Sequence, residues 1–193
     1  MKPVSTCEAA DVLRQGGVIL TPTETVVGLV ASQRGLRRLS EIKHRDPEKP
    51  IALLCATEKE AFEIASGVPA IAEKLAELYW PGSLTLVLRG VGGGTIGVRV
   101  PDHEVVVELL AAYGDPLYAT SANLASESPP AALEEVDPRV AELVDAVVEG
   151  ETGGGEASAV VDLSGDKAQL LRSNRILSED ELLRLVRETK EKI

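Results

Sequence analysis

The chain has 193 residues, of which 44% are hydrophobic and 26% are charged. This length is close to that of one domain and is sufficient to bury a core, so residues 1–193 are expected to form a single domain. The net charge of −11 argues against a protein whose whole surface neutralises nucleic-acid phosphates. No stretch approaches the roughly 18 apolar residues of a membrane span, so neither export nor membrane insertion is expected, and a cytoplasmic location is predicted.

The basic residues are distributed unevenly along the chain. From Arg34 to Lys49 there are six Lys and Arg residues and three acids, whereas residues 102–162 hold fourteen acids and only Arg139 as a cation. A basic island in an acidic chain indicates a local site for an anionic small molecule rather than a nucleic-acid groove.

Apolar periodicity and turn residues predict alternating helices and strands. The predicted helices are residues 6–15, 36 to about 46, 58–66, 70–79, 104–113, 140–143 and a last helix that begins at Ser178. The predicted strands are residues 18–20, 28–31, 51–55, 84–88, 96–100, 116–120, 146–148, 159–163 and 169–171. Ser5 with Glu8, and Ser178 with Glu181, are predicted capping boxes. This order indicates an α/β (α+β-like) fold class, with a twisted mixed β-sheet flanked by helices.

The glycine signatures of phosphate-binding loops are absent. Gly92–Gly94 and Gly153–Gly155 are the only candidate segments, and neither opens an obvious helix. Any nucleotide would therefore be bound by cationic side chains and loop hydroxyls. Residues 22–25 are a polar connection between two strands, and Ser121-Ala122-Asn123 follows a strand, which is a typical place for a binding loop.

Metal and nucleophile signatures are equally weak. His44 and His103 lie far apart, Cys7 and Cys55 lack metal-type spacing, and Ser121 has no GxSxG context. The sequence therefore predicts no metal site, no disulfide and no hydrolase triad.

Seven segments together resemble, in order, those of the YrdC-like family. They are residues 21–29 (TPTETVVGL), Lys43-His44-Arg45 with Lys49-Pro50, 80–88 (WPGSLTLVL), 97–103 (GVRVPDH), 120–124 (TSANL), 158–162 (SAVVD) and Leu171-Arg172. Val27, Ser126, Ala159 and Asn174 depart from the usual pattern. Val27 and Ala159 are expected to remove a hydroxyl near the pocket, and Asn174 is expected to tolerate a positive φ.

The resemblance implies a single YrdC-like domain with a concave basic cleft. It also implies an enzyme that makes threonylcarbamoyl-AMP and pyrophosphate from L-threonine, bicarbonate or CO2, and ATP. The product would pass to a transferase complex that modifies tRNA to threonylcarbamoyladenosine. ATP would be a substrate and would carry Mg²⁺. A triphosphate, a carboxylate and a carbamate in one pocket require fixed cations, which the basic island fits.

The resemblance also assigns residues to roles. Lys43 and Arg45 are the expected catalytic cations. ATP is expected to contact Arg45, Lys49, Thr95, Ser121, Asn123 and Arg172, and threonine to contact Thr25, Arg99 and Ser158. Arg99 is expected to clamp a carboxylate, because a guanidinium offers a planar fork.

Simpler interpretations remain open at this point. Lys43 and Arg45 resemble solvated cations at a helix end, Arg99 could be a strand residue facing water, and Ser121 could be a turn former. A double-stranded RNA or tRNA-binding module, and a paralogue that uses another amine or carbamoyl substrate, are the alternative functions. A weak contact with tRNA through the basic island also stays open.

Overall fold

The computed structural model describes residues 3–44, 51–124 and 127–191. Nine strands in this part of the chain form one mixed sheet, in the order β7-β1-β2-β6-β3-β5-β4-β8-β9. The strands are β1 (Val18–Thr21), β2 (Gly28–Ala31), β3 (Ala52–Leu54), β4 (Leu84–Arg89), β5 (Thr95–Arg99), β6 (Leu117–Ser121), β7 (Ala146–Val147), β8 (Ala159–Asp162) and β9 (Gln169–Arg172). The predicted strands and the mixed-sheet fold class are confirmed.

The helices also follow the prediction except at the ends of three of them. The second ends at Ile42 rather than near residue 46, because His44 has a positive φ that an α-helix does not accommodate, and the third and sixth are also shifted. They are α1 (Thr6–Arg14), α2 (Leu36–Ile42), α3 (Glu58–Glu63), α4 (Ala70–Tyr79), α5 (Glu104–Tyr113), α6 (Pro138–Ala141) and α7 (Glu179–Lys190), with short 3-10 helices η1 (Gln33–Gly35) and η2 (Leu133–Glu135). α3 ends before Ser66 because the Ser66 N–H donates to the Arg89 carbonyl at 2.7 Å. α6 begins early because Asp137 caps it and Pro138 suits a first helical turn. Every helix in the described ranges is too short or too polar to span a lipid bilayer.

The two predicted capping boxes have different outcomes. The box formed by Ser5 and Glu8 is confirmed, with both reciprocal bonds present. Only one of the two bonds predicted for the second capping box is present. The Ser178 hydroxyl accepts from the Glu181 N–H, but the Glu181 carboxylate binds the Arg184 guanidinium instead. A charged two-pronged donor is a stronger partner for a carboxylate than one backbone N–H.

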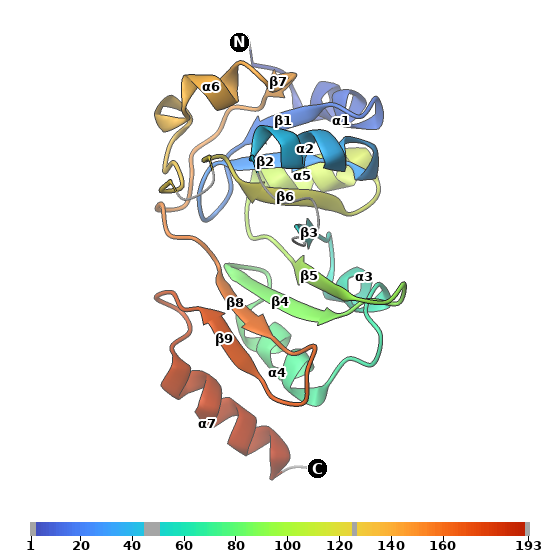
Figure 1. Cartoon of the computed structure of the whole chain (residues 1–193), viewed down its shortest axis with the longest axis vertical. Helices are drawn as coiled ribbons and strands as arrows, with labels where there is room; N and C mark the ends of the chain where they lie inside the picture. The colour runs from blue at the N-terminus through green and yellow to red at the C-terminus, as the bar shows by residue number, and fades with distance from the viewer. Residues whose placement is uncertain (1–2, 45–50, 125–126, 192–193) are drawn as a thin grey trace.

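The upper half of the sheet (β7, β1, β2 and β6) is covered on both faces (Figure 1). Successive strand residues point to opposite faces. Ile19 and Val30 pack in a cluster with residues of α1 and α5, whereas Leu20 and Leu29 pack in a cluster with residues of α2 and α6. This double coverage explains why β1 and β2 are apolar throughout.

The lower half (β5, β4, β8 and β9) is covered by α3, α4 and α7 on one face (Figure 1). Leu84, Leu86 and Leu88 of β4 pack in the core beneath these helices. Thr85 and Val87 alternate with them and line a pocket on the opposite face. The alternation in β4 therefore gives the sheet one apolar face and one face available for a site.

Candidate functional site

The pocket lies between the two halves of the sheet and has a volume of about 300 Å³. It brings together six of the predicted site residues, which are Thr25, Lys43, Arg99, Ser121, Ser158 and Arg172. Its described lining contains three cations and no carboxylate. No group of three or more His, Cys, Asp or Glu residues in the described ranges is placed to hold a metal ion. The pocket is therefore suited to an anionic ligand.

Lys43 joins two of the sequence motifs. It follows α2 as the C-terminal cap, and its side chain is buried. Its ammonium donates to the Ser121 carbonyl at 2.6 Å, the Ser121 hydroxyl at 3.0 Å and the Asn123 amide oxygen at 2.6 Å. The Asn123 amide nitrogen donates in turn to the carbonyls of Leu124 and Glu127. The interpretation of Lys43 as a solvated helix-end cation is wrong, because the loop after β6 surrounds its charge.

Arg99 at the end of β5 is also buried, with 7% of the residue exposed. It forms an ion pair with Glu24, and its Nη1 and Nη2 each lie 3.3 Å from the Thr25 hydroxyl oxygen. The alternative that Arg99 faces water is therefore wrong. The neighbouring polar groups keep a charged side chain in a place that water reaches poorly.

Arg172 on β9 lies beside Ser158, which precedes β8. Its Nε donates to the Ser158 carbonyl at 2.6 Å and its Nη2 to the Ser158 hydroxyl at 3.1 Å. The Ser158 and Thr85 hydroxyls are 2.9 Å apart. Burial, and then the positive charge of Arg99, lower the pKa of Arg172. Two guanidinium groups that repel each other across a pocket favour binding of an anion.

Among the described residues, Thr95 and Asn123 are predicted contacts with ATP that do not line the pocket. Thr95 is exposed at the start of β5 and does not line the pocket. Arg45 and Lys49 lie outside the described residues. Asn123 is not part of the lining but reaches it through Lys43. The roles of all four residues stay predictions.

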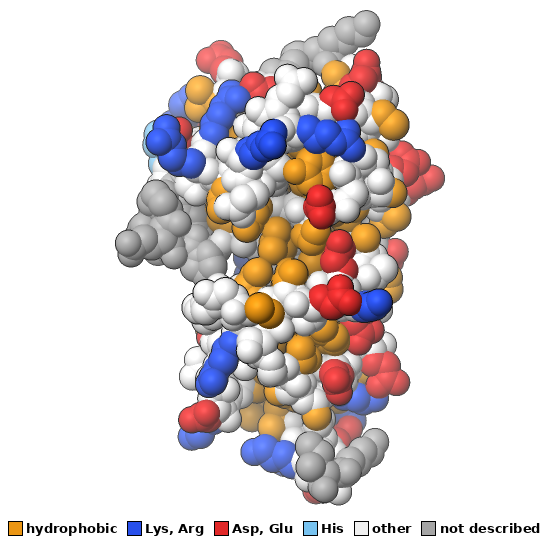
Figure 2. Space-filling model, turned by 90° about the vertical axis from the view of Figure 1, so that its right-hand side faces the viewer, with side chains coloured by type: hydrophobic (Ala, Val, Ile, Leu, Met, Phe, Trp, Pro, Cys, Tyr) orange, Lys and Arg blue, Asp and Glu red, His pale blue; other side chains and the backbone are white. Residues whose placement is uncertain are grey.

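The described cations of the basic island do not line the pocket together. Arg37 pairs with Glu41 at 3.1 Å in an exposed position, and Arg38 pairs with Asp145 at 2.5 Å in a partly exposed one. Only Lys43, among the described cations of the island, lines the pocket. Figure 2 shows Lys and Arg side chains near the top of one face and acidic side chains along its lower right, so that face carries both signs. The concave basic cleft as predicted therefore stays unconfirmed.

Three of the four residues that depart from the family pattern have structural roles other than those predicted. Val27 and Ala159 are fully buried in the core and do not line the pocket, so neither removes a hydroxyl from it. Asn174 has no positive φ. Its side-chain oxygen instead accepts from the N–H groups of Ile176 and Leu177, which shapes a turn. Ser126 lies outside the described residues.

Two features of the site were missed from the sequence. Glu24 was treated as part of a polar connection, although it pairs with Arg99. Gly153 donates its N–H to the Thr23 carbonyl at 3.0 Å, and Gly155 donates to the Thr25 carbonyl at 2.9 Å. A Cβ on Gly153 would lie 2.3 Å from the Glu24 carbonyl oxygen. This glycine segment therefore supports the loop that carries Thr25.

Comparisons with known proteins agree with this fold. The profile of a family described as "Telomere recombination" (Sua5_yciO_yrdC) matches residues 11–174. The threonylcarbamoyl-AMP synthase of Stenotrophomonas maltophilia is 36% identical over 169 residues, which cover 80% of this chain and 90% of that protein. The threonylcarbamoyl-AMP synthase of Pyrococcus abyssi is 33% identical over 185 residues, which cover 89% of this chain and 54% of that protein. The chain thus spans about half the length of the latter relative.

A solved structure gives the same result in three dimensions. The crystal structure of P. abyssi Sua5 complexed with L-threonine matches with a TM-score of 0.83 and 31% sequence identity. The match covers 94% of this chain and 57% of that chain. The similarity therefore extends over nearly the whole chain, with both halves of the sheet included.

Proposed function

Because this chain belongs to the Sua5/YciO/YrdC family, we propose that it is a threonylcarbamoyl-AMP synthase. It acts as a nucleotidyltransferase that converts L-threonine, bicarbonate or CO2, and ATP into threonylcarbamoyl-AMP and pyrophosphate. One observation carries this proposal beyond the relatives' names. Cations from three separate segments, Lys43, Arg99 and Arg172, line one pocket together with hydroxyl groups.

The proposed reaction has two bond-forming steps. The threonine nitrogen bonds to the carbon of CO2 and loses a proton, which gives an N-carboxylate. An oxygen of this carbamate then attacks the α-phosphorus of ATP, the bond from that phosphorus to the bridging oxygen breaks, and pyrophosphate leaves. The carbamate, the triphosphate and the threonine carboxylate are all anionic, so fixed cations and orientation contribute more than a general base.

The pocket has two groups of polar side chains that suit the two substrates. Arg99, Thr25 and Ser158 would bind threonine. Lys43 and the Ser121–Asn123 loop would bind ATP with Arg45, Lys49 and Thr95, and Arg172 would bind nucleotide from beside Ser158. The described lining offers no carboxylate for a resident metal ion, which supports Mg²⁺ arriving as part of the ATP complex.

The partners and domain boundaries belong to the same proposal. A downstream transferase complex would take the threonylcarbamoyl group to the adenosine beside the anticodon of tRNA. The continuous sheet supports residues 1–193 as one domain, because β3 joins the two halves by pairing with both β5 and β6. Among the described cations of the basic island, the two arginines of α2 are available for direct contact with tRNA only in competition with the acids that pair with them.

The test is an adenylate-forming assay. The purified protein is incubated with ATP, Mg²⁺, ¹³C-bicarbonate and each amino acid in turn, and products are read by mass spectrometry. We expect pyrophosphate and an acyl-adenylate that contains the carbon label only with threonine. Labelled product with another amine would instead support the paralogue. Salt-dependent tRNA binding without any adenylate would support the RNA-binding module.

A further inference from the structure

Glu24 and Arg99 form the most enclosed ion pair among the described residues, with 14% and 9% of their side chains exposed. The Arg99 Nε donates to the Glu24 Oε1 at 3.2 Å and to the Gly82 carbonyl at 3.1 Å. The same Glu24 oxygen accepts from the Asp102 N–H at 3.1 Å. Glu24 therefore holds the inner edge of the guanidinium at one end of the antiparallel β4–β5 pair, where Gly82 precedes β4 and Asp102 follows β5.

The outer fork of Arg99 holds a hydroxyl group. Nη1 and Nη2 both point to the Thr25 Oγ1, which lies 2.7 Å from the Thr23 Oγ1. The Thr23 hydroxyl donates its single proton to the Val26 carbonyl at 2.7 Å. Thr25 is consequently the donor toward Thr23 and the acceptor from Arg99. The orientation of the Thr25 hydroxyl is thus fixed by a chain of bonds that begins at Glu24.

This network limits what Arg99 can offer to a ligand. A guanidinium has five N–H groups. In the described structure Glu24 and Gly82 occupy the Nε side, and Thr25 occupies the fork between the terminal nitrogens. The second N–H of Nη1 is the donor that remains for a substrate carboxylate. A two-pronged clamp on the substrate by Arg99 would require Thr25 to move.

Glu24 is not explained by stability alone. Its Oε2 is buried and has no hydrogen-bond partner among the described residues. Burying an ion pair costs desolvation free energy, and a pair with one oxygen unsatisfied recovers less of that cost. A role in the site accounts for a charge at this position.

We propose that Glu24 is a positioning residue for the amino-acid half of the pocket, acting through Arg99 to hold the Thr25 side chain in place on the pocket wall. This inference rests on the proposed function. It assigns Glu24 no contact with substrate and no proton transfer.

The test compares Glu24→Gln with the wild-type protein. Glutamine keeps the shape and one acceptor oxygen but removes the charge that holds Arg99. We expect the KM for threonine to rise about tenfold, the loss of roughly one charge-assisted hydrogen bond, while the KM for ATP stays within about twofold. Asp145→Asn, which breaks the Arg38–Asp145 pair in the upper half, is the matched control and should leave the KM for threonine unchanged.

A double-mutant cycle with Thr25→Val separates positioning from a structural role. If Glu24 acts through Thr25, adding Glu24→Gln to Thr25→Val raises the KM for threonine by less than about twofold further. The proposal would be overturned if the two substitutions had fully additive effects on the KM for threonine. It would also be overturned if Glu24→Gln raised the KM for threonine and the KM for ATP equally. Should Glu24→Gln fail to fold, Glu24→Asp, whose carboxylate is one methylene short of Arg99, goes through the same measurements.

Direct titration with threonine distinguishes this inference from the proposed function. Wild-type protein that binds threonine but forms no adenylate overturns the synthase assignment, and the threonine affinities of the variants then decide the role of Glu24. Wild-type protein that forms the adenylate, with unchanged threonine affinity in Glu24→Gln, overturns only the positioning role.

Discussion

The ammonium of Lys43 and the side-chain oxygen of Asn123 are 2.6 Å apart, although the two residues are separated by eighty positions in the sequence. This contact fixes the loop after β6 against the end of α2. Because the ammonium also binds Ser121 twice, its position is set from three directions. The loop and the lysine therefore form one unit of the site.

Replacing Lys43 by methionine tests that unit. Methionine keeps a long side chain but removes the charge and its donors. We expect pyrophosphate release to be lost and ATP binding to weaken roughly 10- to 100-fold, which corresponds to one charge-assisted hydrogen bond. ATP titration and a pyrophosphate assay measure both. Lys74→Met, which removes a surface pair with Glu77, should change neither. Normal turnover of folded Lys43→Met would contradict the assignment.

Arg45→Ala and Lys49→Ala should each weaken ATP binding and abolish most pyrophosphate release while the thermal unfolding temperature stays near that of the wild type. Both cations follow the pocket lysine in the sequence and are predicted to meet the phosphates. Added salt should weaken ATP binding moderately by screening. Arg37→Ala is the control, because Arg37 pairs with Glu41 at the surface. Full activity of the Arg45→Ala variant would show that Arg45 does not bind ATP.

Arg99→Lys should affect threonine more than ATP. Lysine keeps the charge, but one ammonium cannot hold both Glu24 and Thr25 as the planar guanidinium does. We expect threonine affinity to fall about tenfold or more, with a smaller change for ATP. Separate titrations with each ligand make the comparison. Equal losses would place Arg99 with the nucleotide instead.

Gly153→Ala should disturb the threonine side of the pocket, although Gly153 itself does not line the pocket. The new Cβ would lie 2.3 Å from the Glu24 carbonyl oxygen, so the backbone must shift. Overpacking of this kind costs about 1–3 kcal/mol, and each kcal/mol lowers the melting temperature by roughly 2–4 °C in a chain of this size. Gly165→Ala, whose Cβ would meet nothing within 4 Å, is the control. Unchanged melting and threonine KM would show that the segment is not a support.

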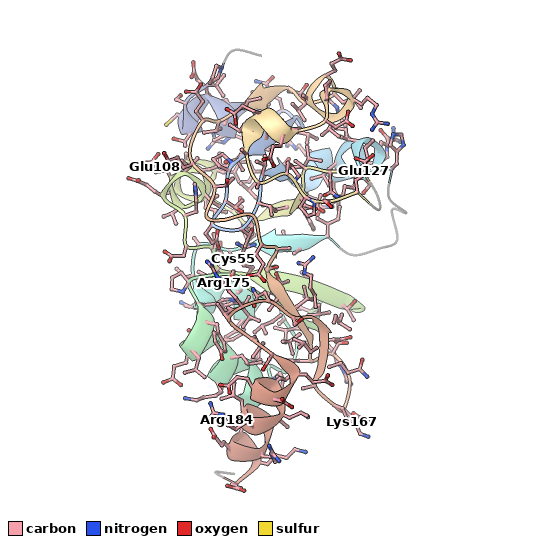
Figure 3. All side chains as sticks on the ribbon, turned by 90° about the vertical axis from the view of Figure 1, so that its left-hand side faces the viewer. Cys55, Glu108, Glu127, Lys167, Arg175 and Arg184 are labelled. Atoms are coloured by element: carbon pink, nitrogen blue, oxygen red, sulfur yellow. The ribbon has the colours of Figure 1, made fainter. Side chains whose placement is uncertain are left out.

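Cys55 should be unreactive toward thiol reagents in the folded protein. Burial, and then the charge of Glu60, raise its pKa to about 12, whereas Cys7 is exposed. Figure 3 shows Cys55 where the two halves of the molecule meet. One thiol should react near pH 8 in the native state and two after denaturation. In the unfolded chain the thiol ionises at its ordinary pKa of 9.0, whereas in the folded protein it stays neutral until about pH 12. Ionisation therefore favours the unfolded chain in this range, so the free energy of unfolding falls as the pH rises from 9.0 towards 12. Rapid native labelling of both thiols would contradict this.

Much of the fold was accessible from the sequence because its strands are short and bounded by clear turn signals. The alternation in β4 and the helical spacing in α4 are local patterns, and both elements lie where the patterns put them. The errors occur where another polar group competes for a local one, whether it is distant, as for Ser66, or only three residues away, as for Glu181. Ser66 binds Arg89 instead of continuing α3, and Glu181 binds Arg184 instead of closing a capping box.

The site was predictable only as a set of motifs. Family resemblance identified Lys43, Arg99 and Ser158, and the pocket contains all three. Glu24 was missed because its partner lies seventy-five residues away, and nothing local distinguishes a buried acid from a polar loop residue. Charge counts along the sequence also ignore helix periodicity, which turns Arg37 and Arg38 of the basic island toward surface acids and away from the pocket.

The strand order has a consequence for how the chain acquires its pocket during synthesis. β4 pairs with β8, and β8 with β9, so Ser158 and Arg172 join the wall long after Thr25 and Arg99 have been made. Until then one edge of β4 lacks its partner, and such open edges are prone to intermolecular pairing. Pairings between distant segments also slow folding. A nascent chain should therefore be unable to retain substrate, and most in need of a chaperone, until its last strand has left the ribosome.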